Sequence, residues 1–412
     1  MTKVLFIWPP KIEYIFSIQK HYTNFGETVA YLDAQNDVEV DVMDGSALMY
    51  FQWNFIEAYS KEYDFMVVYT DLHNSISAIK AAHQCKEISP KTTIISYGQG
   101  TPYAPDIYID QGFDAAVHDP MYQKSIADFI SYKQGEVSKR MLKGISFKEK
   151  GSLVSIRDTH ELDVAEVAFP ALDKLPIGQY KQISGRDQVC FTVTRGCPYP
   201  CRFCRVPIDQ GRKVSYRPVP DVVAYLKQVK DDFASIKLIA PTFTIDRDWV
   251  LELCSTIKEE NLDVKWIVTT RLELLDHELL NAMSNAGCIA IAFGLETLYT
   301  STQNRVDKQL EPEVVIKQVE LIHSYGIIPK AFIMLGIPGQ TREEIVELYD
   351  FLQKHRVEIR PKEYYPYETL LSSNDKIELL QKFERENVYN NRIPGVHTMQ
   401  FVKWLSNRTS VR

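Results

Sequence analysis

Residues 1–135 alternate short apolar runs with longer amphipathic stretches. The apolar runs have the length of strands, which we expect at residues 3–8, 38–43, 65–69, 93–97 and 115–118. Helical patterns lie between them, such as residues 75–87, where apolar side chains recur every third or fourth position. Strands that alternate with helices predict parallel βαβ units in a doubly wound, flavodoxin-like or Rossmann-like sheet.

A second alternation of the same kind runs from Gln188 to Tyr367. Its strands are expected at residues 189–194, 236–240, 265–269, 289–293, 330–335 and 363–365. Thr341 and Glu344 form a capping-box pattern, and Pro312 fits a first helical position. Gly287 and Gly326 fit positions just past helix ends. Six βα units in a row predict a partial (βα)6 barrel, whose chemistry lies at the carboxyl ends of its strands.

The remaining segments have weaker patterns. Residues 136–187 form an expected connector, with a hairpin over residues 143–156 around Lys150 and Gly151. Residues 368–412 form an expected C-terminal helical tail, with a helix over residues 375–387. The predicted organisation is therefore α/β, with a sheet domain (1–135), the connector (136–187), a partial barrel (188–367) and the tail (368–412).

Composition narrows the class of protein. A chain of 412 residues with 45% hydrophobic residues can bury real cores, and its net charge of −7 gives no reason to expect a nucleic-acid partner. No apolar run approaches the roughly 18 residues of a membrane span, and the N-terminus lacks the pattern of a signal peptide. Seven cysteines are too few and too scattered for a disulfide framework. We expect a cytoplasmic protein without a membrane partner.

Three of the cysteines stand together directly after the first expected barrel strand. Cys197, Cys201 and Cys204 have the spacing C-x3-C-x2-C. A [4Fe–4S] cluster is usually held by four thiolates, so three would leave one iron open to a small molecule. The alternatives are a zinc knuckle or a tight turn that happens to contain cysteines. Zinc sites usually pair C-x2-C with a second pair far along the chain, and the other cysteines here show no such pairing.

The cysteine motif, with Phe203 just before its last cysteine, resembles that of the radical SAM superfamily. The resemblance implies that Cys197, Cys201 and Cys204 hold the cluster, and that the open iron binds S-adenosylmethionine (SAM). It also implies that Phe203 packs beside the adenine. An electron from the cluster would then cleave the sulfonium bond, giving methionine and a 5′-deoxyadenosyl radical that abstracts hydrogen from the substrate.

Other strand ends resemble further SAM-binding segments of that superfamily. By resemblance, Thr270 and Arg271 reach the SAM carboxylate, and a guanidinium suits a carboxylate because it can bind both oxygens. Glu296 would orient groups near the ribose; the alternative is a carboxylate that caps the strand. Gly336 and Pro338 lie in a turn that would approach the adenine, although a tight turn into the next helix explains them equally well.

Two groups of residues near the expected barrel mouth each allow more than one role. Tyr364 and Tyr365 are candidates for lining a substrate pocket or relaying protons, and strand-edge packing is the equal alternative. Basic residues surround the cysteines and could tune the potential of a cluster. We favour a solvated surface, or a docking patch for an acidic flavodoxin or ferredoxin reductant. These basic residues are Arg195, Arg202, Arg205, Arg212 and Lys213.

The first sheet carries its own candidate ligand site. In doubly wound sheets, ligands bind beyond the carboxyl ends of the strands at the topological switch point. The order of elements resembles the cobalamin-binding domain that precedes many radical SAM domains, and Asp71-x-His73 resembles part of a cobalt-ligand motif. The alternative is a flavodoxin-like scaffold that has lost its ligand. The expected cobalamin-binding residues are Pro9, Pro10, Thr70, Asp71, His73, Gly98, Gln99, Gly100 and Thr101.

Together these resemblances imply a cobalamin-dependent radical SAM enzyme that methylates an unactivated carbon or phosphorus of a small molecule or peptide. One SAM would methylate the cobalamin, and a second would yield the radical. The nearest alternative is a radical rearrangement or cyclisation without methyl transfer, and a more distant one is a non-catalytic iron–sulfur or cobalamin-binding protein. A methylthiotransferase is rejected, because it predicts three further cysteines in the first domain and only Cys85 precedes residue 190.

Overall fold

A computed structural model describes residues 1–9, 18–47, 52–72, 74–308, 310–364, 376–378 and 380. These residues fall into two compact units. The first unit contains the described residues of 1–195, 208–216 and 368–384, and the second contains those of 196–207 and 217–367.

The first unit is built on a mixed sheet with the strand order β2-β1-β3-β4-β5-β6-β7. Its strands are β1 (Thr2–Trp8), β2 (Val38–Asp44), β3 (Phe65–Thr70), β4 (Thr93–Gly98), β5 (Ala115–Val117), β6 (Ile145–Glu149) and β7 (Ser152–Ile156). Strands β1 to β5 are parallel in the order 2-1-3-4-5, which confirms the predicted flavodoxin-like winding. The predicted hairpin is β6–β7, and it also extends the sheet, because β6 pairs antiparallel with β5.

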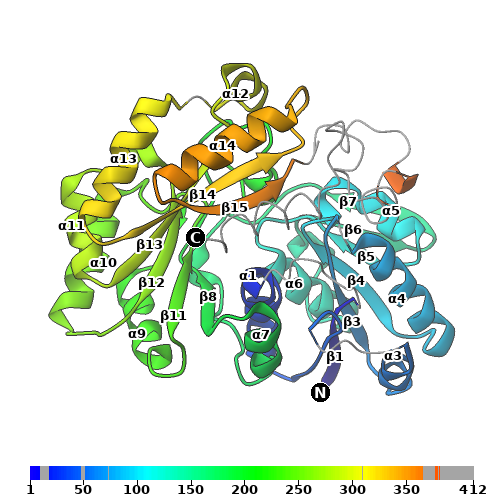
Figure 1. Cartoon of the computed structure of the whole chain (residues 1–412). Coiled ribbons are helices and arrows are strands. Elements are labelled where there is room, and N and C mark those ends of the chain that lie inside the picture. The colour runs from blue at the N-terminus through cyan, green and yellow to red at the C-terminus, as the bar shows by residue number, and fades with distance from the viewer. Residues whose placement is uncertain are drawn as a thin grey trace. The chain divides into compact units, whose positions relative to one another are not determined.

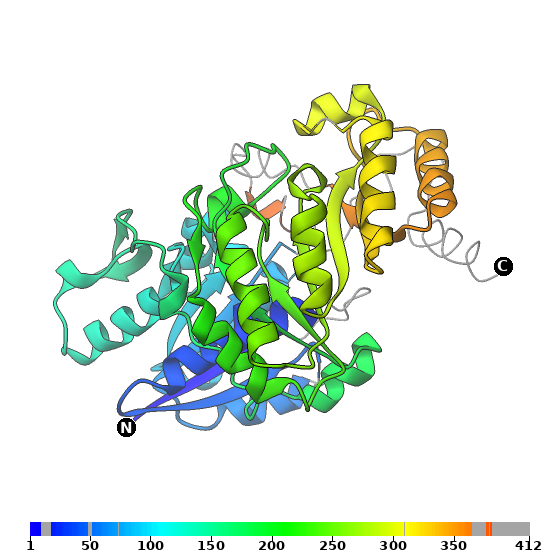
Figure 2. The same cartoon turned by 90° about the vertical axis from the view of Figure 1, so that its left-hand side faces the viewer.

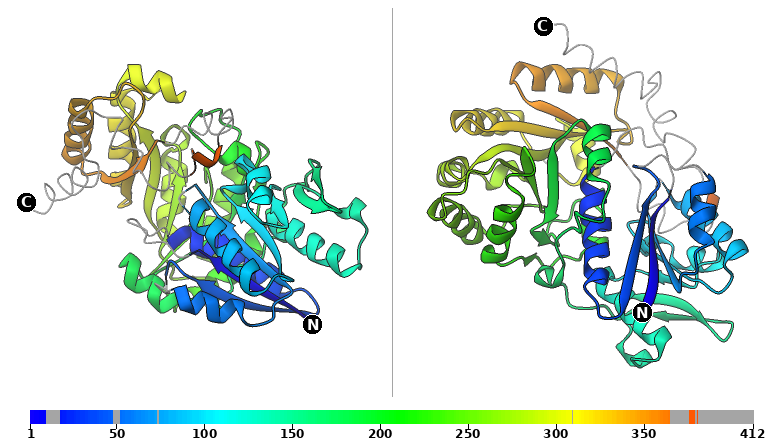
Figure 3. Two further views of the ribbon diagram at one scale, coloured as in Figure 1. Left: turned by 90° about the vertical axis from the view of Figure 1, so that its right-hand side faces the viewer. Right: turned by 90° about the horizontal axis from the view of Figure 1, so that it is seen from below.

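The helices of the first unit cover both faces of this sheet. They are α1 (Ile18–Lys20), η1 (His21–Gly26, a π-helix), α2 (Glu27–Asp33), α3 (Gln52–Tyr59), α4 (Ser75–Ile88), η2 (Thr101–Tyr103), α5 (Pro105–Asp110), α6 (Tyr122–Gln134), η3 (Lys139–Met141), η4 (Val164–Glu166) and α7 (Ile177–Ser184). Figure 1 shows α3, α4 and α5 on one face and α1 and α6 on the other; the left panel of Figure 3 views the first of these faces.

Alternation along β1 explains the two cores of this unit. Leu5 and Ile7 are buried in a cluster with α3, α4 and α5. Phe6 points to the other face, where its ring contacts Phe25 and Tyr97 edge-on, with ring centroids 6.2 Å away in both cases. A strand buried on both faces is typical of a parallel sheet covered by helices on each side.

Strands β8 and β11–β15 form a second sheet, in the order β15-β14-β13-β12-β11-β8. Its strands are β8 (Gln188–Thr192), β11 (Ser235–Ile239), β12 (Trp266–Thr270), β13 (Cys288–Glu296), β14 (Ile328–Leu335) and β15 (Glu358–Glu363). Strands β11 to β15 pair in parallel, which confirms the predicted βα alternation. Their helices include α9 (Val219–Val229), α10 (Arg247–Glu259), α11 (His277–Asn285), α12 (Thr300–Val306), α13 (Pro312–Ser324) and α14 (Arg342–Lys354).

Helices α9, α10, α11, α13 and α14 lie along one face of this sheet in Figure 1, and Figure 2 turns that side toward the viewer. The predicted helix boundaries are confirmed where the sequence marks them. Thr341 and Glu344 form the capping box of α14, and Pro312 begins α13. Gly287 and Gly326 adopt φ values of +90° and +72°, which favour glycine just past a helix.

Two strand predictions were wrong in detail. The first barrel strand ends at Thr192, and Thr194–Arg195 form a separate short strand, β9, that pairs antiparallel with β10 (Ser215–Tyr216). The last strand is Glu358–Glu363 rather than residues 363–365. It is an edge strand that contains charged residues and Pro361, so its sequence lacks the apolar alternation on which the prediction relied.

Within the described residues, no helix is long and apolar enough to cross a membrane.

Candidate functional site

The three clustered cysteines lie in one loop of the second unit, which we call the cysteine loop (Gly196–Pro207). Cys197 is 7% exposed, whereas Cys201 and Cys204 are partly exposed, and none of the three is in a disulfide. The Sγ of Cys197 lies 3.7 Å from the Oγ1 of Thr242, and the backbone N–H of Cys204 donates to the carbonyl of Cys201 over 3.1 Å. The loop thus brings Cys201 and Cys204 together in one turn.

The other four cysteines are buried and belong to packed cores. Burial raises the pKa of Cys85 to about 11 and that of Cys254 to about 12. It also raises the pKa of Cys288 well above its ordinary value. A buried thiol with a raised pKa stays protonated, and it is a thiolate that binds metal. The structure therefore separates the cysteine loop chemically from Cys85, Cys254 and Cys288.

Arg271 faces the cysteine loop from the end of β12. Its Nη1 lies 3.7 Å from the Sγ of Cys201, and its guanidinium carbon lies 4.0 Å from the ring centroid of Tyr199. Its Nε donates to Glu273 over 2.7 Å. The cation–π contact and the ion pair fix the guanidinium beside the loop. The sequence analysis did not predict this role of Tyr199, although its position between Cys197 and Cys201 was a signal for it.

The donor set of the cysteine loop fits an iron–sulfur cluster better than a single metal ion. In the part of the chain that the structure describes, no three His, Cys, Asp or Glu side chains converge on one ion position. A [4Fe–4S] cluster does not require such convergence, because each thiolate binds a different iron. A compact loop with three cysteines therefore fits such a cluster.

Thr270 and Glu296, two further predicted residues, lie at the ends of the neighbouring strands β12 and β13. Both make buried polar contacts. The hydroxyl of Thr270 lies 2.5 Å from that of Thr244. Glu296 is 5% exposed, and its Oε1 lies 3.6 Å from the Nζ of Lys308. Burial raises the pKa of Glu296, and the Lys308 ammonium opposes that rise. The sequence predicted Glu296 but not its buried partner Lys308.

Backbone conformation singles out Glu296 as well. Its φ is +67°, a left-handed value that costs about 1–3 kcal/mol in a residue other than glycine, and the register of β13 against β14 shifts at this point. A Cβ on Gly294 would lie 2.3 Å from the Glu296 carboxylate and 2.4 Å from the Lys308 ammonium. A larger residue two positions before Glu296 would therefore make the ends of the Glu296 and Lys308 side chains shift.

Phe203, Tyr364 and the turn after β14 are brought together by one apolar cluster. Phe203 and Tyr364 pack against buried Ile337, which lies between Gly336 and Pro338 in the sequence, together with Val306 and Met334. The turn itself is fixed by Gln340, whose side-chain oxygen accepts from the N–H of Gly336 over 2.9 Å. Tyr365, the second tyrosine candidate, lies outside the described residues.

In the first unit, the loops after β3 and β4 are joined by hydrogen bonds. The hydroxyl of Thr70 lies 2.8 Å from that of Thr101 and donates to the carbonyl of Tyr97 over 3.1 Å. The N–H of Gly100 donates to the carbonyl of Thr70 over 2.9 Å. Asp71, at 3% exposure, pairs with Lys20 over 2.9 Å. The structure thus brings together most of the predicted cobalamin-binding residues at one edge of the sheet.

At Gly98 and Gly100, neighbouring side chains of the protein leave no room for a Cβ atom. A Cβ on Gly98, where φ is +109°, would lie 2.6 Å from the ring of Tyr69. A Cβ on Gly100 would lie 2.6 Å from the hydroxyl of Tyr108. Pro9 is buried and Gln99 is partly exposed, while Pro10 and His73 lie outside the described residues.

The prediction that Arg195 belongs to an exposed basic patch was wrong. Arg195 is 3% exposed and lies 3.6 Å from the carboxylate of Glu27, which is fully buried. By contrast, the Arg202 side chain is 61% exposed and that of Lys213 is 75% exposed, as expected for a solvated surface. The sequence placed Arg195 at the end of an apolar strand, and that position would have argued for burial.

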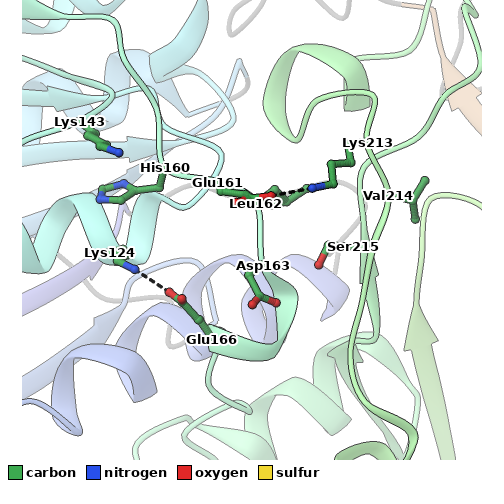
Figure 4. Close-up of a pocket in the computed structure, with 10 residues that line it drawn as sticks. All are labelled: Lys124, Lys143, His160, Glu161, Leu162, Asp163, Glu166, Lys213, Val214 and Ser215. Atoms are coloured by element: carbon green, nitrogen blue, oxygen red, sulfur yellow. Dashed lines mark hydrogen bonds and ion pairs between the residues drawn. The ribbon is translucent and has the colours of Figure 1, made fainter.

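The first unit also contains a polar cavity of about 480 Å³ beside the connector (Figure 4). Four of its charged groups form two ion pairs: Lys124 with Glu166 over 2.8 Å, and Lys213 with Glu161 over 2.6 Å. None of the predicted cofactor-binding residues lines it, so it is separate from the sites described above.

Comparison with known proteins agrees with this fold. Residues 191–352, which include the cysteine loop, match the Radical SAM superfamily. An uncharacterised methyltransferase of Pyrococcus horikoshii is 26% identical over 287 residues, which are 67% of this chain and 61% of that relative. The chain thus spans about three fifths of the relative's length.

Two solved structures share the fold over most of the chain. The cobalamin-dependent SAM radical enzyme OxsB, solved with aqua-cobalamin, has a TM-score of 0.71 at 15% identity and covers 100% of this chain and 62% of its own. The radical SAM methyltransferase TsrM of Kitasatospora setae, solved with cobalamin and a [4Fe–4S] cluster, has a TM-score of 0.69 at 14% identity. That match covers 89% of this chain and 74% of TsrM. At such identities the likeness concerns the fold.

Proposed function

We propose that this chain is a cobalamin-dependent radical SAM methyltransferase that acts on a small molecule, with a [4Fe–4S] cluster held by Cys197, Cys201 and Cys204. The carrying observation is the division of the cysteines into those of the cysteine loop, beside Arg271, and those buried in cores. When bound, the cluster supplies the electron that cleaves SAM to methionine and a 5′-deoxyadenosyl radical, and cobalamin supplies the methyl group.

On this proposal, Arg271 binds the carboxylate of SAM. Its guanidinium is fixed between Tyr199 and Glu273 and approaches Cys201, so a carboxylate beside the loop would gain a charge-assisted contact without reorganisation of the side chain. Thr270 precedes it on the same strand. Its hydroxyl is hydrogen-bonded to that of Thr244, so Thr270 holds the neighbouring loop in place and adds no second charge for the SAM carboxylate.

Glu296 and Phe203 would hold the remainder of SAM. Glu296 presents a buried carboxylate that can accept from ribose hydroxyls, and Lys308 keeps a compensating positive charge beside it. Phe203 packs with the turn at Gly336 and Pro338 through Ile337, which gives an apolar surface for an adenine ring. Tyr364 belongs to the same cluster and would line the substrate side.

The closed loops of the first unit would bind cobalamin through their shape. Thr70 and Thr101 are fully buried and bond to one another, so they hold the loops rather than coordinate cobalt. The direct contacts with cobalamin would then come from partly exposed Gln99 and from the loop backbone. The proposal is supported by the cobalamin in OxsB and TsrM, which share this fold.

The test is the composition and activity of the wild-type protein. It is expressed with cobalamin supplied, purified and reconstituted without oxygen, and analysed for iron, sulfide and corrinoid. About four irons and one corrinoid per chain are expected. Reduction with dithionite in the presence of SAM should then give 5′-deoxyadenosine. Absence of iron, or zinc in its place, would overturn the proposal as a whole.

Two further outcomes test the cobalamin assignment and the methyl-transfer assignment separately. Four irons without corrinoid would remove the cobalamin assignment and favour radical chemistry without methyl transfer. With a substrate in hand, the mass of the product distinguishes methylation, which adds a methyl group and yields S-adenosylhomocysteine, from a rearrangement, which adds nothing.

A further inference from the structure

Strand β7 (Ser152–Ile156) is the last strand of the first sheet, and among the described residues no strand pairs with its outer side (Figure 1). The N–H and C=O groups of an open edge are available to any other strand, so proteins usually protect such edges with charged residues or proline. Strand β7 contains neither, since its sequence is Ser-Leu-Val-Ser-Ile. Leu153 is 50% exposed, so this edge is both accessible and unprotected.

The other edge strands of the two large sheets differ from β7. Strand β2 carries exposed Glu39 and Asp41, and strand β15 carries several charged residues and Pro361. Strand β8 is uncharged, but all of its residues are buried. Among these described edges, β7 alone combines an uncharged sequence with exposure, and this combination favours pairing with another strand.

The geometry of the β6–β7 hairpin determines which main-chain groups face the open edge. Its turn is formed by Lys150 and Gly151, whose φ values are +50° and +81°, as in a two-residue type I′ turn. In such a hairpin, the residues that flank the turn exchange main-chain hydrogen bonds, and hydrogen-bonded pairs then alternate along the two strands. The main-chain groups of Leu153 and Ser155 therefore point away from β6, toward the open edge.

We propose that β7 is a self-association surface, on which a second copy of this chain pairs its own β7 in the antiparallel direction. Such a pair is two-fold symmetric, and two-fold symmetry is the commonest symmetry of homo-oligomers. In the register centred on Val154, Leu153 and Ser155 of one copy lie opposite Ser155 and Leu153 of the other. Their outward N–H and C=O groups then bond reciprocally, and the two Val154 side chains meet at the close, non-hydrogen-bonded position between them.

The charges at the two ends of β7 fit the same register. Lys150 and Asp158 are exposed and lie equally far from Val154 along the chain. In the symmetric pair, each Lys150 therefore comes opposite Asp158 of the second copy. Arg157 comes opposite Gly151, so it meets no like charge. Exposed ion pairs add little affinity, but complementary charges select this register, because like charges in the same places would oppose association.

The experiment is sedimentation velocity of the full 412-residue chain over a wide range of concentrations. A pair of five-residue strands buries less area than the roughly 1,600 Å² of a standard interface, so the dimer should dissociate on dilution. Leu153→Pro removes an outward N–H, which an edge strand tolerates, and should weaken dimerisation by more than about tenfold. Leu153→Ala is the matched control: it keeps the N–H and should weaken dimerisation less.

Charge reversal keeps the proposal testable if Leu153→Pro does not fold. Lys150→Glu and Asp158→Lys each place like charges opposite one another and should weaken the dimer several-fold, whereas the double variant should restore it. Lys91→Glu, the same change at another exposed turn of the first unit, should have no effect. A wild type that stays monomeric at every concentration would overturn the proposal. A dimer that Leu153→Pro leaves intact, or that the double variant does not restore, would also overturn it. These results do not depend on iron or corrinoid content, so they are independent of the test of the proposed function.

Discussion

The loops at the strand ends of the two sheets are built in opposite ways. In the first unit, Thr70 and Thr101 are buried and bond to each other, and the loops close on the protein's own tyrosines. In the second unit, the cysteine loop keeps Cys201 and Cys204 partly exposed beside Arg271. The difference indicates that the first set of loops maintains a shape, whereas the second offers reactive groups.

This comparison predicts two kinds of mutational effect. Substitutions in the closed loops should lower the free energy of unfolding, because they disturb packing or leave buried polar atoms unpaired. Substitutions in the cysteine loop should change stability little and change metal binding strongly.

The largest loss of stability is expected for Gly98→Ala. The new methyl group would meet Tyr69 and the carbonyl of Thr70 at 2.6–2.7 Å, and alanine is disfavoured at a φ of +109°. We expect about 2–3 kcal/mol of destabilisation by urea unfolding of the apo protein. Gly135→Ala is the control: its φ is +81° but nothing lies within 4 Å of the new Cβ, so the difference between the variants measures the contact. Equal losses would contradict the closed-loop description.

A smaller loss is expected for Thr70→Val. Valine preserves the shape but removes the hydroxyl that bonds to Thr101 and to the carbonyl of Tyr97, so a destabilisation of about 1–2 kcal/mol should appear in the same unfolding assay. Thr159→Val, at an exposed position of the connector, should be neutral. No effect of Thr70→Val would mean that the two loops are not held by this bond.

The pH dependence of stability should show the contribution of His160, which joins the connector to α6 and to the loop before it. Burial disfavours its charged form, but hydrogen bonds to Asp119 and Asp128 outweigh burial and raise its pKa to about 9. A raised pKa contributes stability that is complete below the unfolded value near 6.5 and is lost as the pH rises through about 9.

We expect the unfolding free energy to fall by about 1 kcal/mol between pH 7 and 10 through this group, after allowance for screening by water. The His160→Gln variant should lack that decline, and its stability should be nearly flat over the same interval. A decline that persists unchanged in the variant would show that other groups cause it.

The smallest effect is expected for Arg202→Gln in the cysteine loop. Its ion pair with Asp307 joins side chains that are 61% and 39% exposed, and such pairs contribute less than about 0.5 kcal/mol. Raising the salt concentration should remove even this difference. A loss as large as that of Thr70→Val would show that the cysteine loop is held as rigidly as the closed loops.

The sequence predicted the architecture well where periodicity is strong. Strands such as β3 and β4 are continuous apolar runs, and the capping box of α14 has a fixed spacing, so both were found within one or two residues. The edge strand β15 was misplaced, since its charged residues and proline hide the alternation. That β6–β7 joins the first sheet was not predicted, because pairing between distant strands leaves no local pattern.

Within the candidate site, the sequence pointed to Cys197, Cys201 and Cys204 because their spacing is a recognisable motif. Partners that come from distant positions were missed, namely Thr242 beside Cys197, Lys308 beside Glu296 and Glu27 beside Arg195. Sequence alone gives no measure of burial for a single arginine. Arg195 was therefore assigned to an exposed patch with Arg202, and the structure separates the two.

The most direct test of the central claim is the iron content of four single variants, Cys197→Ala, Cys201→Ala, Cys204→Ala and Cys254→Ala, each reconstituted and desalted in the same way as the wild type. We predict that the three variants of the cysteine loop lose nearly all of the roughly four irons per chain, while Cys254→Ala, whose thiol is buried in a core, retains them. Wild-type iron content in any of the three, or an equal loss in Cys254→Ala, would contradict the assignment of the cysteine loop as the cluster site.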